Sequence, residues 1–233
     1  MGEKILDLLF PKFCLFCGRE NTYLCPDCFS QIKTYATPFC PYCGSRSPEG
    51  TICPSCKKYL TGFVAAGPYK DKRLKEVIET FKYKFVKELA TPLALLIFKF
   101  LKENQQVEFF KNPLNFLIVP IPLHKRRQRE RGFNQAEEIG KQLSPLLKIP
   151  IKTDILLRRK NTKPQVKLKK EERKENIKDA FIINPKIDIS SLKDKKIILL
   201  DDVFTSGSTM EEAAKVLRDR GIKGIWALAV AKE

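Results

Sequence analysis

IILLDDVFTSGST, residues 197–209, is the stretch that decides the fold. Its first four residues are apolar, which is typical of a strand buried on both faces in a parallel sheet. Asp201 and Asp202 follow at the carboxyl end of this strand, and a small, hydroxyl-rich turn comes next. Apolar residues at positions 210, 213, 214 and 217 have helical spacing, and Gly221 stands where such a helix would end. The stretch therefore predicts a strand, a turn and a helix.

The turn between this strand and helix predicts a phosphate site. A helix N-terminus offers unpaired backbone N–H groups and a positive dipole end. The residues expected to hold the phosphate are Thr205, Ser206, Gly207, Ser208 and Thr209. Upstream, Asp201 and Asp202 can accept hydrogen bonds from vicinal sugar hydroxyls or hold Mg²⁺. Together these groups predict a pocket for a ribose 5-phosphate.

This order of strand, paired acids, phosphate turn and helix resembles the signature of the type I phosphoribosyltransferases, which bind phosphoribosyl pyrophosphate (PRPP). One alternative is a P-loop ATPase, which needs the pattern G-x-x-x-x-G-K-[ST], and the sequence contains none. The other is a plain doubly wound strand whose acids are only solvated. The PRPP interpretation is favoured because the acids and the phosphate turn occur together.

All eight cysteines lie near the start of the sequence, in four CxxC pairs. The two thiolates of a pair can reach one tetrahedral zinc ion, so four pairs predict two structural Cys₄ sites. The expected ligands are Cys14, Cys17, Cys25, Cys28, Cys40, Cys43, Cys53 and Cys56. Sites built from sequential pairs are favoured, and an interleaved arrangement stays open. Disulfides are disfavoured because nothing in the sequence suggests secretion.

The composition points to an anionic partner. The chain has 233 residues, and its 44 Lys and Arg against 27 Asp and Glu give a net charge of +17. Such an excess suits nucleic acid, phosphorylated ligands or an anionic membrane surface. The alternative, a charged surface of a heat-adapted protein, explains a one-sided excess less well. No apolar run approaches a membrane span and no signal peptide is apparent, so we expect a cytoplasmic protein without membrane insertion.

Between the cysteines and the second strand, the sequence predicts a strand at 62–69, a helix at 71–81 and a long apolar helix at 88–102. The link between the helices, residues 82–85, alternates lysines with the rings of Tyr83 and Phe85. Such a pattern suits single-stranded nucleic acid. A helix connection whose rings pack inward is the favoured interpretation.

A basic loop is expected after the strand at 117–119, before a helix that runs to about residue 147. Arginine forks and backbone N–H groups there suit a pyrophosphate, although not all of the cations can face one ligand. The candidates are His124, Lys125, Arg126, Arg127 and Arg131. A solvated charge run or a nucleic-acid arm is the alternative.

A long polar connection follows a further strand at 154–159. Connections of this length are uncommon unless they have a function, so it predicts a lid over PRPP. A surface hairpin is the alternative. The lid candidates are Arg158, Lys160, Thr162 and Gln165. A weakly amphipathic helix ends this connection near residue 178, and short strands are expected at 181–183 and 224–230.

The motifs at 119–137, 158–165, 175–181 and 197–209, in this order behind a cysteine-rich start, resemble the ComF family of competence proteins over essentially the whole chain. The resemblance implies a double zinc ribbon fused to a type I phosphoribosyltransferase fold and a link to natural DNA uptake with other DNA-uptake proteins. One departure matters: where purine-salvage phosphoribosyltransferases carry an acid, this sequence has Thr205, which is no general base near neutral pH.

We therefore expect an α/β fold with a mostly parallel sheet and helices on both faces, residues 61–233, behind a double zinc ribbon, residues 1–60. The leading hypothesis is a PRPP-binding, phosphoribosyltransferase-like protein in which Asp201 and Asp202 act with Mg²⁺. Whether a phosphoribosyl group is transferred, and to which acceptor, stays open. The alternative is an adaptor without catalysis that binds single-stranded DNA and retains the phosphate pocket.

Overall fold

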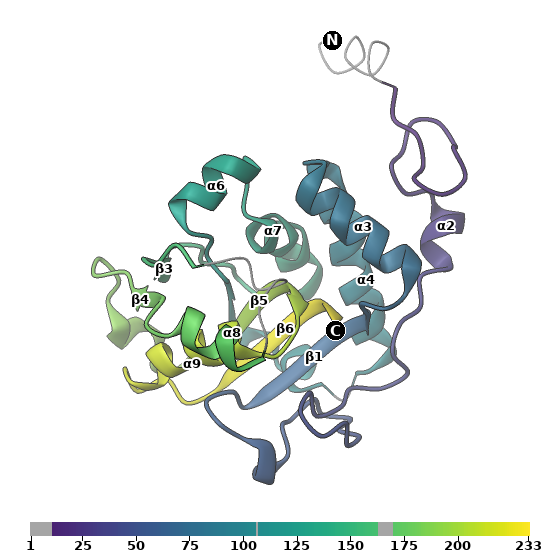
Figure 1. The fold of residues 1–233 in the computed structure, drawn as a ribbon. Coiled ribbons are helices and arrows are strands. Elements are labelled where there is room, and N and C mark those ends of the chain that lie inside the picture. Colours follow the sequence, from purple (N-terminus) through teal and green to yellow (C-terminus); the bar gives the residue numbers. More distant parts are fainter. Residues whose placement is uncertain (1–10, 106, 163–169) are drawn as a thin grey trace.

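The computed structural model describes residues 11–105, 107–162 and 170–233, and its centre is a four-stranded parallel sheet of order β1-β6-β5-β2 (Figure 1). The four strands are β1 Gly62–Pro68, β2 Phe116–Pro120, β5 Lys196–Phe204 and β6 Ile225–Lys232. A separate antiparallel pair joins β3 Leu156–Arg158 to β4 Phe181–Ile183. The predicted, mostly parallel sheet is confirmed.

Helices cover both faces of the sheet because successive strand residues point to opposite sides. Ile198 and Leu200 of β5 enter a core shared with the helices that follow β1 and β2. Ile197 and Leu199 enter a second core with the helix that follows β5. On the first face lie α3 Lys72–Tyr83, α4 Ala90–Glu103 and α7 Gln135–Leu147, and on the second α9 Ser208–Arg218.

Shorter elements complete the described chain. They are η2 Lys87–Leu89, α5 Glu108–Lys111, η3 Pro113–Asn115, α6 Lys125–Arg131, α8 Lys170–Ile177 and η5 Ile189–Leu192. Within this part of the chain, no helix combines the length and the apolar character that crossing a bilayer requires.

The carboxyl ends of all four parallel strands share one edge of the sheet. β2 and β5 are neighbours in the sheet, yet α7, which follows β2, and α9, which follows β5, lie on opposite faces. This arrangement opens a crevice at the carboxyl edge, which is where ligands bind in open α/β sheets.

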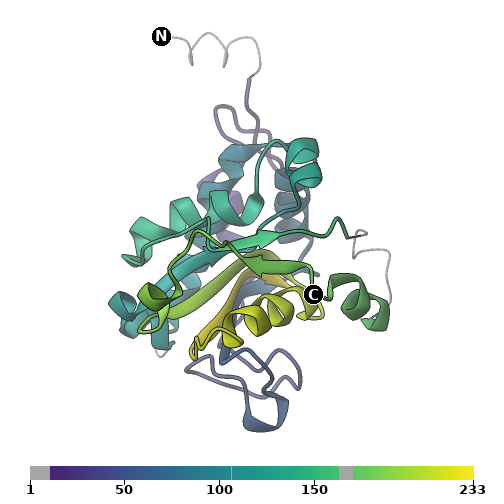
Figure 2. The same cartoon turned by 90° about the vertical axis from the view of Figure 1, so that its left-hand side faces the viewer.

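The cysteine-rich segment forms two ribbons on different sides of the molecule. The first ribbon, residues 11–31, contains α2 Pro26–Ser30 and lies beside α3 (Figure 1). The second ribbon, residues 38–60, contains η1 Pro54–Cys56 and lies beneath the sheet next to α9 (Figure 2). Each ribbon starts with the same kind of antiparallel bridge, Phe13 with Glu20 and Phe39 with Arg46.

The basic segment after β2 is a helix, so its prediction as a loop was wrong. The helix α6 begins where the His124 imidazole Nδ1 accepts a hydrogen bond from the Arg126 backbone N–H at 3.3 Å. Arg126 and Glu130, one turn apart, form an ion pair at 3.0 Å. Gly132, with φ of 69°, ends the helix in the left-handed conformation.

The rings of the predicted link at 82–85, of which Tyr83 is the last residue of α3, do not pack inward, so that prediction was also wrong. Tyr83 is 57% exposed and Phe85 is 51% exposed. The buried place is taken by Phe81, whose ring lies 5.2 Å from that of Phe133, while a φ of 59° at Phe85 turns the chain. A smaller difference concerns Asp201 and Asp202, which lie within β5 rather than after it because β6 pairs with β5 as far as Phe204.

Candidate functional site

A cavity of about 320 Å³ opens at the carboxyl edge of the sheet, where β2 and β5 end. It is lined from four directions: by β5 and the turn before α9, by α3, by α6, and by β3. Its charged and polar lining includes Asp201, Asp202, Thr205, Gly207, Thr209, Lys82, Glu79, Arg127, Arg131, Asn134 and Arg158. Residues far apart in the sequence thus meet around one space.

The acidic floor of the cavity is the pair Asp201 and Asp202. Asp202 is buried and forms an ion pair with Lys82 of α3 at 2.9 Å, while its backbone N–H donates to Asp201 Oδ1, also at 2.9 Å. Burial first, and then the charge of Asp202, raise the pKa of Asp201 to about 7, although Lys82 and Arg158 act in the opposite direction.

This pair has the chemistry that Mg²⁺ requires. Mg²⁺ is usually held by one or two carboxylates together with oxygens of the substrate. Lys82 already neutralises Asp202, so Asp201 is the carboxylate that still lacks a cation. Its pKa is raised mainly by burial, and a bound cation would lower it again. Asp201 therefore fits the role of a magnesium ligand that works with a bound anion.

The turn before α9 is shaped for close approach of a ligand to the backbone. Gly207 stands at the N-cap with φ of 79°, a conformation that favours glycine. The side chains or backbone of Thr205, Gly207 and Thr209 line the cavity. The hydroxyls of Ser206 and Ser208 lie 2.9 Å from each other, and neither residue is part of the lining. A turn at a helix N-terminus presents backbone N–H groups and the positive end of the helix dipole, so this turn is suited to a phosphate.

Opposite the acids, three guanidinium groups form a basic wall. Arg127 donates to the backbone carbonyl of Thr162 at 2.6 Å, and Arg158 donates to the Thr162 hydroxyl at 2.5 Å. Burial, and then the charge of Arg127, lower the pKa of Arg158 to about 10; burial and the neighbouring Arg131 likewise lower the pKa of Arg127. These cations repel one another, so an anion in the cavity would relieve the repulsion.

The remaining predicted residues lie around the cavity rather than in its lining. His124 caps α6, Lys125 and Arg126 are exposed on that helix, and buried Thr162 is held by the two arginines. Lys160 points away, because its ammonium donates to the carbonyl of Lys178 at 2.7 Å. Gln165 lies outside the described residues.

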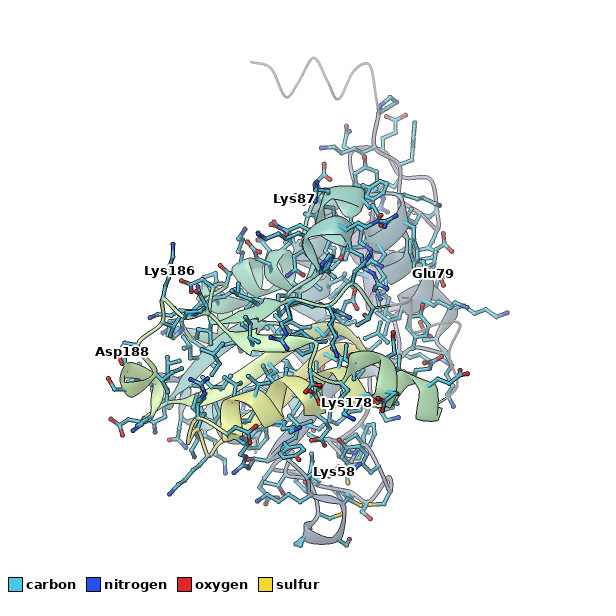
Figure 3. The ribbon with its side chains drawn as sticks, turned by 60° about the vertical axis from the view of Figure 1, so that its left-hand side comes forward. Lys58, Glu79, Lys87, Lys178, Lys186 and Asp188 are labelled. Carbon is cyan, nitrogen blue, oxygen red and sulfur yellow. The ribbon has the colours of Figure 1, made fainter. Side chains whose placement is uncertain are left out.

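Sequence reasoning missed several residues of the site. Lys82 and Glu79 are supplied by α3, on which Glu79 is labelled in Figure 3, and Tyr69 follows β1. Glu79 accepts a hydrogen bond from the Tyr69 hydroxyl at 3.3 Å. The only local signal was the polar stripe of α3. The partner of Lys82 lies 120 positions away in the sequence, so the pairing depends on the fold.

Each ribbon brings four cysteine sulfurs together. One cluster is formed by Cys14, Cys17, Cys25 and Cys28, and the other by Cys40, Cys43, Cys53 and Cys56, with all sulfurs of a cluster within 4.8 Å of one another. The Sγ–Sγ distance is 3.6 Å between Cys17 and Cys25 and 3.5 Å between Cys43 and Cys53. Four sulfurs at 2.3 Å from one zinc ion stand about 3.8 Å apart. The clusters therefore fit two structural zinc sites, and the predicted sequential pairing is confirmed.

Comparisons with known proteins agree with this organisation. The model of the double zinc ribbon domain matches residues 5–57, and the model of the phosphoribosyl transferase domain matches residues 131–232. Competence protein F of Haemophilus influenzae is 33% identical over 94% of this chain and 96% of its own length. Competence protein ComFC of Bacillus subtilis is 30% identical over 89% and 82%, and DNA utilization protein YhgH of Escherichia coli is 28% identical over 95% and 98%.

Proposed function

This chain belongs to the ComF family of competence proteins, and we propose that it binds PRPP with Mg²⁺ in the cavity at the carboxyl edge of its sheet. The observation that carries the proposal is that paired carboxylates, a helix N-terminal turn and a wall of arginines meet around one space. PRPP carries vicinal hydroxyls, a 5-phosphate and a pyrophosphate, so each part of this ligand has a matching wall.

Each wall has its own role in the proposal. Asp201 and Asp202 accept hydrogen bonds from the ribose hydroxyls, and Asp201 holds Mg²⁺ together with oxygens of the ligand. The turn at 205–209 binds the 5-phosphate through its backbone N–H groups. Arg127, Arg131 and Arg158 neutralise the pyrophosphate, and its arrival relieves the repulsion among them.

The proposal extends to transfer of the phosphoribosyl group. The bond from the anomeric carbon to pyrophosphate breaks, the electron pair leaves with pyrophosphate, and the acceptor nucleophile forms the new bond. The arginine wall stabilises the departing charge. A protonated acceptor needs a base, and Thr205 cannot supply one. Glu79 is a carboxylate in the cavity lining outside the β5 pair, and it is the candidate for that task.

Calorimetric titration with PRPP and Mg²⁺ tests the proposal. Asp201→Asn keeps the shape of the side chain and leaves the ion pair of Lys82 with Asp202 in place. We expect affinity to fall on the order of 100-fold, because charge-assisted hydrogen bonds and the metal contact are lost. Asp194→Asn, at an exposed position before the other end of the same strand, is the matched control. Equal affinity in both variants contradicts the proposal, as does absence of binding in the unaltered protein.

A second function is supported by the exposed ring of Tyr83 next to α6. Arg131 of α6 lies over the Tyr83 ring at 5.7 Å, and Lys125 and Arg129 are exposed on the same helix. Exposed rings beside cations suit single-stranded DNA, whose bases stack while its phosphates are neutralised. The names of the relatives, competence and DNA utilization proteins, favour this partner and a role in DNA uptake with other proteins. Clusters of thiolates suit a reducing compartment, so we place this role in the cytoplasm.

Single-stranded DNA binding is tested by titration in low and moderate salt. Binding should be sequence-tolerant and should weaken steeply with salt, because counterions are released. Arg126→Ala with Arg129→Ala should reduce both the affinity and the salt slope. Lys186→Ala with Lys193→Ala, exposed on the connection from β4 to β5, is the control for net charge (Lys186 in Figure 3). If the affinity for single-stranded DNA depends on salt in the same way in the α6 variant, α6 does not bind DNA, and only the PRPP proposal remains.

A further inference from the structure

The second ribbon is hydrogen-bonded to the first turn of α9. Both carboxylate oxygens of Glu211 accept hydrogen bonds from it: Oε1 from the Tyr42 hydroxyl, and Oε2 from the Tyr59 backbone N–H at 3.0 Å. Glu211 itself is buried, and its own backbone N–H donates to the Gly207 carbonyl at 2.9 Å, which closes the first turn of the helix. The ribbon therefore holds the side chain whose backbone closes the phosphate turn.

The same tyrosine fills the space behind Gly207. A Cβ atom at Gly207 would stand 3.2 Å from the Tyr42 hydroxyl oxygen and 2.5 Å from the Phe204 ring. The Phe204 ring packs against that of Tyr42, with 6.4 Å between centroids, and against that of Phe63 at 4.5 Å. The back of the phosphate turn thus rests on side chains, one of which belongs to the second ribbon.

Both donors to Glu211 depend on the second cysteine cluster for their position. Tyr42 lies between Cys40 and Cys43, in the tight turn that brings these two sulfurs together. Tyr59 lies three residues after Cys56, the last cysteine of the cluster. Lys58, labelled in Figure 3, has its ammonium 5.0 Å from the centre of the Tyr42 ring. A metal ion in this cluster would hold the turn and hence both donors.

The electrostatics give this contact a consequence for anion binding. A carboxylate in the first turn of a helix occupies the same positive end that a phosphate would use. The Tyr42 hydroxyl and the Tyr59 backbone N–H instead bind both oxygens of the Glu211 carboxylate. The Tyr42 hydroxyl is the donor in this contact, because a carboxylate can only accept. If the hydroxyl is lost, the released carboxylate competes with an incoming phosphate.

We propose that Tyr42 and Glu211 are positioning residues, through which the metal-loaded second ribbon holds the turn at 205–209 in its phosphate-binding conformation. Occupancy of the second cysteine cluster then sets the affinity of a site on another part of the molecule. The inference rests on the proposed PRPP site, and it adds that the second ribbon regulates the affinity of that site. It assigns to the second ribbon a task beyond its own stability.

The test uses Tyr42→Phe, which removes the hydroxyl alone, in the full chain. The affinity for PRPP with Mg²⁺ should fall about tenfold, because a hydrogen bond to a charged group is lost. Zinc content should stay at two ions per chain. Tyr23→Phe makes the same change in the first ribbon and should leave affinity unchanged. Glu211→Gln should weaken binding several-fold, and the double variant should bind no more weakly than Tyr42→Phe alone, because the two residues act as one contact.

A second readout is independent of PRPP. Amide hydrogen exchange over residues 205–211 of the ligand-free protein should be faster in Tyr42→Phe and unchanged in Tyr23→Phe. If the unaltered protein does not bind PRPP, the proposed function fails, while this measurement still decides the positioning. Unchanged exchange in Tyr42→Phe, or losses of affinity that multiply in the double variant, would overturn the inference.

Discussion

The two ribbons share a ligand set and a local fold, yet they are attached to the rest of the chain in different ways. The first ribbon is attached by packing: apolar side chains such as Phe16 lie against the core, Arg73 lies over the Phe16 ring at 4.8 Å, and Lys12 pairs with Glu88 at 3.5 Å. The second ribbon is hydrogen-bonded to both ends of α9, through Glu211 in the first turn and Arg218 in the last. One cysteine cluster therefore lies beside the domain, and the ribbon of the other is hydrogen-bonded to the helix that follows the phosphate turn.

The difference shows that metal-ligand spacing alone does not reveal what a zinc site does. Both clusters have paired CxxC motifs and nearly the same loop lengths. What separates them is the residue directly before the second cysteine: Tyr42 reaches a buried carboxylate, whereas Phe16 packs under an arginine. A hydrogen bond to a buried charge is directional, and surface packing is not. Only the second ribbon can therefore transmit its geometry to α9.

The largest expected effect comes from removing one metal site at a time. Cys53→Ser with Cys56→Ser should lose one zinc ion and weaken the binding of PRPP with Mg²⁺ on the order of 100-fold, because both hydrogen bonds to Glu211 lose their support. Cys14→Ser with Cys17→Ser should also lose one zinc ion but keep affinity within about twofold, since Arg73, the α3 residue that lies over the Phe16 ring, does not line the cavity. Metal analysis and calorimetry on the full-length variants measure both quantities. Equal losses of affinity in the two variants would show that the two ribbons do not differ in their effect on the PRPP site.

The sequence predicted the local parts of this picture well. The apolar run before Asp201 predicted a buried parallel strand, and the CxxC spacing predicted two closed clusters, because both signals depend on neighbours in the chain. The helix α9 and its start at the phosphate turn followed from spacing in the same way. That the phosphate turn lies at the carboxyl edge of the sheet followed from the general topology of parallel sheets.

Contacts between distant segments could not be predicted. Lys82 pairs with Asp202, and Tyr42 binds Glu211 across 169 positions, and no periodicity within either segment encodes such a partner. The link at 82–85 failed for a related reason: its rings looked like core residues, but Phe81 and Phe133 already fill that part of the core. Competition for a buried place is decided by tertiary packing, which overrides local pattern.

A smaller effect concerns how the stability of the protein depends on pH. Asp201 in the cavity and the cysteines of the two ribbons should change it in opposite directions. The pKa of Asp201 is raised from 3.8 to about 7 in the folded protein, so the folded state holds a proton that the unfolded chain releases between pH 4 and 7. The free energy of unfolding should fall as pH rises through this window, by up to about 4 kcal/mol, and level off above it. Metal binding by thiols has the opposite dependence, because protons must leave for zinc to bind.

Asp201→Asn isolates this contribution, because the amide does not titrate and the zinc sites are common to both proteins. Urea unfolding at pH 5, 6 and 8 should show the variant gaining stability relative to the unaltered protein as pH rises. A constant difference across these values would mean that Asp201 is charged throughout, and the acidic floor would then need a cation even without ligand.

The smallest effect concerns the two arginines that attach the ribbons, Arg73 for the first and Arg218 for the second. Arg73→Gln removes a cation–π contact between two half-buried side chains, so the free energy of unfolding should fall by about 1 kcal/mol. Arg218→Gln removes hydrogen bonds to the Tyr59 carbonyl at 2.9 Å and to the Thr61 hydroxyl at 3.0 Å, and it should cost about 1 to 2 kcal/mol. Thermal unfolding of both variants measures the difference.

The same two variants should differ in PRPP affinity. Because Tyr59 also donates to Glu211, Arg218→Gln should weaken PRPP binding by a few-fold, whereas Arg73→Gln should leave it unchanged. If Arg218→Gln lowers stability without changing affinity, the last turn of α9 only fastens the ribbon, and Tyr42 alone controls the phosphate turn.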